Sequence, residues 1–223
     1  MGLFGKKRAK AREAEADVAE AEVEKTVGPY DEAEAPEDDE LLECGALRLP
    51  PVEGATIQFT VERNREVVLG AVYIVGESAL QLQVFAAPKS SDLWDDVRAD
   101  MISSIASQGG SSREADGEYG REIHAQMPVE GSRTVNPVRY LGIDGPRWLL
   151  RATLTGRAAV DDAEARSLLR AVLDRLVVVR GVAAHPPRDI LPLEVPRSGS
   201  KHSEPQRDRL SLPRRGPEIS EVR

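Results

Sequence analysis

The sequence predicts an α+β domain, with an antiparallel sheet of about six strands and two amphipathic helices in the order β-β-β-α-β-β-β-α. Two kinds of pattern carry this prediction. Short segments alternate apolar and polar residues, the period of a strand with one buried face, and turn residues separate them. Two longer segments space apolar residues three or four apart, as on one face of a helix. The short connections favour hairpins and therefore antiparallel pairing.

Three strands are expected first. Residues 57–61 and 80–86 alternate apolar with polar side chains. Between them, residues 67–75 form an almost continuous apolar run broken only by Gly70, which is typical of a central strand covered on both faces. Together the three segments predict an antiparallel meander.

A helix follows, with Ser91 or Asp92 as its N-cap and Gly109-Gly110 at its end. We interpret the polar, glycine-rich stretch 107–120 as an exposed loop, because it holds almost no large apolar residues. The apolar stripe of this helix consists of Trp94, Val97, Met101 and Ile105.

Three further strands are predicted at 123–127, 138–143 and 147–154. Asp144-Gly145, followed by Pro146, lies between the last two and indicates a hairpin turn, because this dipeptide tolerates positive φ. The glycine near the end of the preceding strand, Gly142, is interpreted as part of a turn as well.

The second helix has the clearest start. Asp161 as N-cap, with Glu164 three residues later, resembles a capping box, and Gly181 is expected to end the helix. Residues 190–193 are expected to add an edge segment, since the neighbouring prolines exclude a central strand. The predicted buried stripe consists of Leu168 or Leu169, Val172, Leu173 and Leu176.

Charge is concentrated outside the predicted domain, within a net charge of −8. Residues 1–12 are basic, and residues 13–43 carry 14 acidic side chains against one lysine. Blocks of like charge with few large apolar residues indicate solvated tails. We therefore expect a disordered leader at 1–43, one domain at 44–195 and a disordered basic, proline-containing tail at 196–223.

The sequence favours a cytoplasmic protein. The first residues lack the apolar run of a signal peptide, and no stretch approaches the roughly 18–20 apolar residues of a membrane helix. Cys44 is the only cysteine, so an intramolecular disulfide is excluded. Acidic neighbours raise the pKa of a thiol, and we interpret Cys44 as incidental.

Catalytic, metal and cofactor motifs are missing from the chain. None of the three histidines has a second ligand at helical spacing, and no glycine-rich segment matches a nucleotide loop or a serine nucleophile turn. We therefore predict no cofactor, metal or catalytic residue. If a site exists, its first candidates are His124, Arg139 and Tyr140, because polar groups on strands can converge on one sheet face.

Four segments carry a resemblance to a known family: "SDLWDDVRADMISSIASQGG", "GPRWLLRATLTGRAA", "LLRAVLDRLVVVRG" and "AHPPRDILPL". Over roughly residues 40–195, and in the opening "MGLFGKK", the chain resembles an actinobacterial family of domains of unknown function. The resemblance implies a cytoplasmic bacterial protein with no assigned activity. Genes of that family often lie near a dUTP pyrophosphatase gene, which implies a link to nucleotide or genome maintenance. The layout of strands and helices is also similar to PsbP-like folds.

Three functions remain open. The first is a non-catalytic interaction or adapter domain that binds another protein, favoured by the absence of a convergent catalytic set. The second is an accessory protein that binds nucleic acid or an anionic membrane surface through its basic ends, with Lys6, Lys7 and Arg8 as the first contacts. The third is an enzyme with an unrecognised site, which requires at least two of the three candidate residues to share a concave pocket.

Overall fold

A computed structural model describes residues 27–62, 67–89 and 92–196. Its main feature is a seven-stranded sheet in the order β4-β5-β6-β10-β9-β8-β7, in which every neighbouring pair is antiparallel. The strands are β4 (Thr56–Glu62), β5 (Val67–Val75), β6 (Ser78–Ala86), β7 (Ser111–Gly117), β8 (Gly120–Pro128), β9 (Val135–Gly145) and β10 (Trp148–Gly156).

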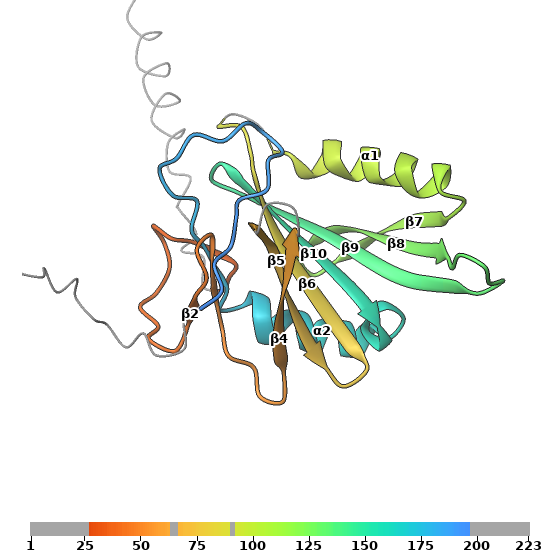
Figure 1. The fold of residues 1–223 in the computed structure, drawn as a ribbon, viewed down its shortest axis with the longest axis horizontal. Coiled ribbons are helices and arrows are strands. Elements are labelled where there is room, and N and C mark those ends of the chain that lie inside the picture. Colours follow the sequence, from red (N-terminus) through yellow and green to blue (C-terminus); the bar gives the residue numbers. More distant parts are fainter. Residues whose placement is uncertain (1–26, 63–66, 90–91, 197–223) are drawn as a thin grey trace, which may run out of the picture.

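Successive strands of the chain run from each edge of the sheet toward its centre (Figure 1). The meander β4-β5-β6 forms one half. Helix α1 (Trp94–Ser107) then carries the chain to the opposite edge, where β7 begins. The second meander, β7 to β10, returns and closes the sheet by pairing β10 with β6, with Leu150 opposite Val84.

Within this sheet, β7 is the strand that the sequence did not predict, so the expected loop at 107–120 is wrong, and the sheet has seven strands instead of about six. Ser111–Gly117 contains Ala115 as its only apolar residue besides glycine. The segment pairs with β8 through its backbone at the edge of the sheet, with Arg113 opposite His124. An edge strand of this kind needs little apolar surface, so its pattern is not visible in the sequence.

The two helices lie on opposite faces of the sheet. Helix α2 (Asp162–Leu173) follows a short 3₁₀ turn, η1 (Arg157–Ala159), and covers the face that carries Leu150 and Leu154. Helix α1 covers part of the other face, where Trp94 and Ile105 pack on Ile123 and Leu149. Each face therefore has its own apolar core. In the described part of the chain, no helix has the length and apolar character needed to span a bilayer.

A second, small sheet joins both ends of the predicted domain. Its strands are β1 (Tyr30–Asp31), β2 (Leu42–Glu43), β3 (Leu47–Leu49) and β11 (Val177–Val178), in the order β1-β11-β3-β2. β1 runs parallel to β11, with Tyr30 opposite Val177. The second helix therefore ends at Leu173 instead of at Gly181, because the following valines form a strand.

Residues 27–43, the described part of the acidic segment, are packed on the domain, so the prediction of a disordered leader is wrong for these residues. Tyr30 is 7% exposed, and Asp31 accepts a 2.8 Å hydrogen bond from the indole nitrogen of Trp148. Arg175 donates to the carboxylates of Asp38, at 2.7 Å, and Glu40, at 2.8 Å. The composition of this segment indicated that it is solvated. Composition does not show that arginines of the folded domain lie opposite these acidic side chains. Residues 1–26 and 197–223 lie outside the described residues.

Helix α2 begins as the sequence predicts. The Asp161 side chain accepts hydrogen bonds from the backbone nitrogens of Ala163, at 3.0 Å, and Glu164, at 3.2 Å. The reciprocal half of the capping box is not made, because the Glu164 carboxylate accepts a hydrogen bond from Ser78 on β6. This hydrogen bond between Ser78 and Glu164 links the start of α2 to the sheet.

Helix α1 is capped from outside its own segment. Leu93 is the N-cap residue and makes no side-chain cap, while Ser91 lies outside the described residues. The Asp144 carboxylate of β9 accepts from the backbone nitrogen of Leu93 at 2.8 Å and from that of Trp94 at 3.1 Å. A carboxylate at this position satisfies free amides and opposes the positive end of the helix dipole. The prediction of Ser91 or Asp92 as the cap missed this residue, which is distant in the chain.

Two glycines of β9 make room for the two tryptophans of the chain. A Cβ on Gly142 would lie closer than 3.0 Å to the ring of Trp94, and a Cβ on Gly145 would lie equally close to Trp148. Both glycines lie within the strand, so their interpretation as turn residues is wrong. The turn itself is Pro146-Arg147, and Arg147 takes the positive φ of 66°.

Residues 190–193 lie between β5 and β6, where these two strands separate, and do not form a strand. β5 and β6 pair only as far as Ala71 and Leu82. Beyond that point the backbone of Leu191 donates to Val84 at 2.8 Å, and that of Leu193 donates to Val68 at 2.9 Å. The expected edge segment therefore consists of isolated bridges between two diverging strands.

Candidate binding groove

A row of three basic side chains crosses the edge of the sheet on the face that α2 covers. Strand register places Arg113 of β7 opposite His124 of β8, and His124 opposite Arg139 of β9. Residues directly opposite on antiparallel strands project to the same side. The row therefore runs across three strands toward the first turn of α2.

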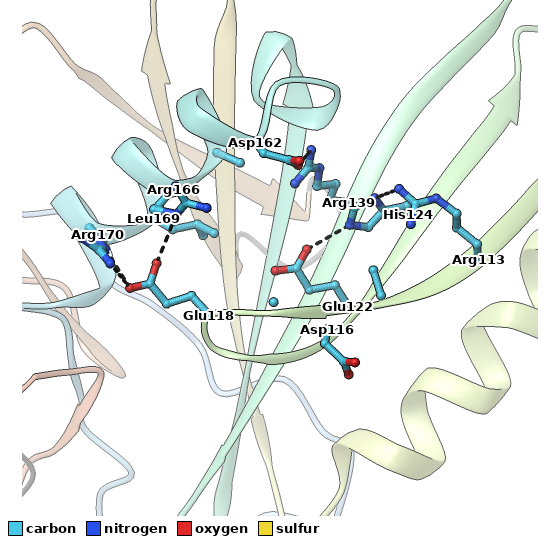
Figure 2. A pocket seen from close by; sticks show the side chains of 13 residues that line it. Arg113, Asp116, Glu118, Glu122, His124, Arg139, Asp162, Arg166, Leu169 and Arg170 are labelled. Atoms are coloured by element: carbon cyan, nitrogen blue, oxygen red, sulfur yellow. Dashed lines mark hydrogen bonds and ion pairs between the residues drawn. The ribbon is translucent and has the colours of Figure 1, made fainter.

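The row forms the wall that two adjoining hollows share. One has a volume of about 460 Å³ and extends along α2 to Arg170, and the other has a volume of about 390 Å³ and extends to Ser111 and Val160. We call them together the α2 groove. Figure 2 shows the first hollow, with α2 on one side and the β7–β8 hairpin on the other. The residues that line both hollows are Arg113, His124, Arg139 and Asp162.

Arg139 is held by groups at the start of α2. Only 6% of the residue is exposed. Its Nε donates to the carbonyl of Ala159 at 2.9 Å, and its Nη2 donates to the Asp162 carboxylate at 2.5 Å. The guanidinium holds the pKa of Asp162 below its ordinary value, because the hydrogen bond and the positive charge both favour the ionised carboxylate.

His124 is bonded at both ring nitrogens (Figure 2). A guanidinium can only donate, so the 2.8 Å contact with Arg113 makes Nδ1 an acceptor. Nε2 then carries the hydrogen and donates to the Glu122 carboxylate at 3.1 Å. Glu122 is 5% exposed, and Gly117 on the facing strand leaves space for its carboxylate. The two contacts together fix the orientation of the ring between Arg113 and Glu122.

The far end of the groove is closed by the turn between β7 and β8. The Glu118 carboxylate accepts from Arg170 of α2 at 2.5 Å, and this contact lowers the pKa of Glu118 below its ordinary value. Next to it, the Tyr119 hydroxyl donates to Asp174 at 2.5 Å. Burial, with the Asp174 contact second, raises the pKa of Tyr119. These contacts link the hairpin tip to the C-terminal half of α2.

The structure brings together two of the three residues that the sequence singled out. His124 and Arg139 share the groove, whereas Tyr140 lies on the opposite face, in the cluster below α1. Sequence reasoning missed Arg113, which it placed in a loop, and Glu122. It also gave Asp162, at the start of α2, no role in a site. The available signal was strand alternation, which places Glu122 and His124 on one face and separates Arg139 from Tyr140.

Metal chemistry and thiol chemistry find no support among the described residues. In residues 27–62, 67–89 and 92–196, no group of three or more His, Cys, Asp or Glu side chains is arranged to hold a metal ion. Cys44 is fully buried, and burial raises the pKa of its thiol to about 11, with the charge of Glu43 as the smaller cause. The direction of this pKa shift agrees with the prediction, which attributed it to the acidic neighbours alone.

Fold and groove define an α+β protein with a mainly antiparallel sheet, one helix on each face, and a charged groove between one helix and the sheet edge. The family "Protein of unknown function (DUF3710)" matches residues 28–202, and the chain belongs to this family. No protein of known, curated function matches. The family assignment establishes an uncharacterised domain, while the source organism and the gene neighbourhood stay predictions.

One solved structure shows limited similarity. It is described as "Solution Structure of Cyanobacterial PsbP (CyanoP) from Synechocystis sp. PCC 6803". The likeness covers 63% of this chain and 94% of that chain, with 14% identity and a TM-score of 0.38. The α+β class rests on the strands and helices of this chain.

Proposed function

We propose that this chain is a non-catalytic adapter that binds a segment of another protein in the α2 groove. The observation that carries the proposal is that each polar side chain in the shared wall of the groove already has a hydrogen-bond partner in the wall or next to it. Arg139 is paired with Asp162, and His124 is bonded at both nitrogens. A general base needs a free lone pair within reach of a substrate proton, and the Nδ1 lone pair of His124 is occupied by Arg113.

The groove has the character of a recognition surface. It is lined by charged side chains together with smaller apolar ones, and it is bordered by β7, which is an edge strand of the sheet. Edge strands offer backbone donors and acceptors to an extended peptide, and side-chain pockets beside the edge add specificity. Cationic and anionic side chains both line the groove, so a partner segment that carries both charges can exchange these internal ion pairs for intermolecular ones.

A quantitative pull-down tests the proposal. The tagged full chain is compared with an Arg113→Ala, His124→Ala double variant and with Arg133→Ala, which removes an exposed arginine in the β8–β9 connection. We expect the wild type and Arg133→Ala to retain the same partner, and the groove variant to recover at least about tenfold less of it. Equal recovery by all three proteins would contradict a role for the groove.

The alternative function through the basic ends is an outcome of the same experiment. Lys6, Lys7 and Arg8 lie outside the described residues. A full-length variant with all three replaced by alanine keeps the groove intact. If this variant alone loses its partner, and binding in the wild type weakens sharply with added salt, the contact is electrostatic and the adapter proposal is wrong.

A further inference from the structure

A second pocket lies on the opposite face of the sheet, between α1 and the strands. Its volume is about 370 Å³. Side chains of α1, among them Met101 and Ser104, form one wall, and the floor includes Tyr140 of β9 with Arg151 and Thr153 of β10. None of the described residues that line it carries a carboxylate. This pocket shares no lining residue with the α2 groove.

Arg151 is a largely buried cation without an acidic partner in the described part of the chain. Its Nη2 donates to the neutral amide oxygen of Gln83, and the guanidinium lies 5.0 Å from the centre of the Phe85 ring. Its Nε is buried and has no hydrogen-bond partner among the residues that the structure describes. Burial lowers the pKa of Arg151, although an arginine stays charged at neutral pH. The remaining nitrogen, Nη1, makes no hydrogen bond to any described residue and is available to a ligand.

Neutral donors surround this cation. The hydroxyls of Tyr140 and Thr153 line the same pocket, and neither makes a hydrogen bond to another described side chain or backbone group. Other arginines on the molecule contact carboxylates, such as Arg139 with Asp162 and Arg170 with Glu118. A buried charge is costly unless it is paired, so an arginine with free neutral donors beside it favours a bound anion.

We propose that this pocket binds a small organic carboxylate, whose anionic group pairs with Arg151 and whose apolar body lies against Met101 and Met127. One guanidinium balances one negative charge, which favours a carboxylate over a doubly charged phosphate group. The two methionines add apolar, adaptable surface to the pocket, which suits a short hydrocarbon body. The site is independent of the α2 groove and of the adapter function proposed for it.

An NMR titration of the full chain with sodium hexanoate tests this assignment, with hexan-1-ol and inorganic phosphate as the other probes at constant ionic strength. We expect saturable shifts of the amide signals of Tyr140, Arg151 and Ser104 with hexanoate alone. Arg151→Met is expected to weaken hexanoate binding by about tenfold or more, the loss of one charge-assisted contact. Arg133→Gln, which removes the same charge from an exposed position, is expected to bind as the wild type does.

Stability without ligand provides a second measurement. Methionine has a similar length and no charge, so Arg151→Met is expected to unfold at a urea concentration equal to or above that of the wild type. If that variant does not fold, Arg151→Lys keeps the charge, and it is expected to bind hexanoate more weakly because the planar donor set is lost. Hexanoate binding that is absent in the wild type, or unchanged in these Arg151 variants, would overturn the proposal. So would binding of phosphate in place of hexanoate.

Discussion

Replacing Gly142 with alanine tests whether the fit between β9 and Trp94 holds α1 on the sheet. The new Cβ would lie closer than 3.0 Å to three atoms of the Trp94 ring, while ordinary contact begins at 3.4 Å. Trp94 is 4% exposed, and its indole nitrogen donates to the carbonyl of Arg121 at 2.8 Å. The ring must move, which strains the core and stretches that hydrogen bond. Overpacking costs about 1–3 kcal/mol and the hydrogen bond about 0.5–1.5 kcal/mol, so we expect a loss of about 2–4 kcal/mol.

Urea denaturation followed by tryptophan fluorescence measures this loss, and a double-mutant cycle with Trp94→Val identifies its cause. If the ring is the obstacle, Gly142→Ala should cost much less in the Trp94→Val background than in the wild type. Gly145→Ala is the matched control, because it affects Trp148 on the other face of the sheet and should add independently to Trp94→Val. Additive costs of Gly142→Ala and Trp94→Val would refute the reasoning, since they would show that the two residues do not interact.

Two further predictions concern Cys44 and Asp162. Cys44 should react with a thiol reagent at pH 8 only after unfolding, because the side chain is buried and its pKa is raised to about 11; rapid labelling of the native protein would contradict this. The contact with Arg139 lowers the pKa of Asp162 in the folded state. This contact therefore stabilises the fold fully above the unfolded-state pKa of about 3.9, and the stabilisation is lost as the pH falls through the folded-state pKa. Asp162→Asn should therefore lower stability at pH 7, by at most about 1 kcal/mol because the carboxylate is 77% exposed, and the gap to wild type should close in urea melts at pH 2–3. A gap that widens in acid would reverse the assigned sign.

The strands predicted from the sequence are those in which burial of one face produces an alternation of apolar and polar residues. Leu80, Leu82 and Val84 alternate because one face of β6 packs under α2, and the Asp161 cap is visible because its partners are two and three residues away. Strand β7 has no such pattern, since backbone pairing at the sheet edge holds it. The Asp144 cap of α1 was missed for a related reason, because about fifty residues separate it from the amides that it binds.

The α2 groove depends on register, which no short segment of the chain contains. Alternation alone puts Arg139 and Tyr140 on opposite faces, so the sequence was sufficient to separate them. It was not sufficient to bring Arg113, His124 and Arg139 into one row, because that row requires β7, β8 and β9 to pair without a shift of one residue. Asp162 shows the same limit. Its position at a helix start accounts for its charge, yet in the folded chain that carboxylate also binds Arg139 at the edge of the groove. A residue with a sufficient local explanation can therefore have a second, long-range role, and here that role makes the start of α2 part of the candidate binding surface.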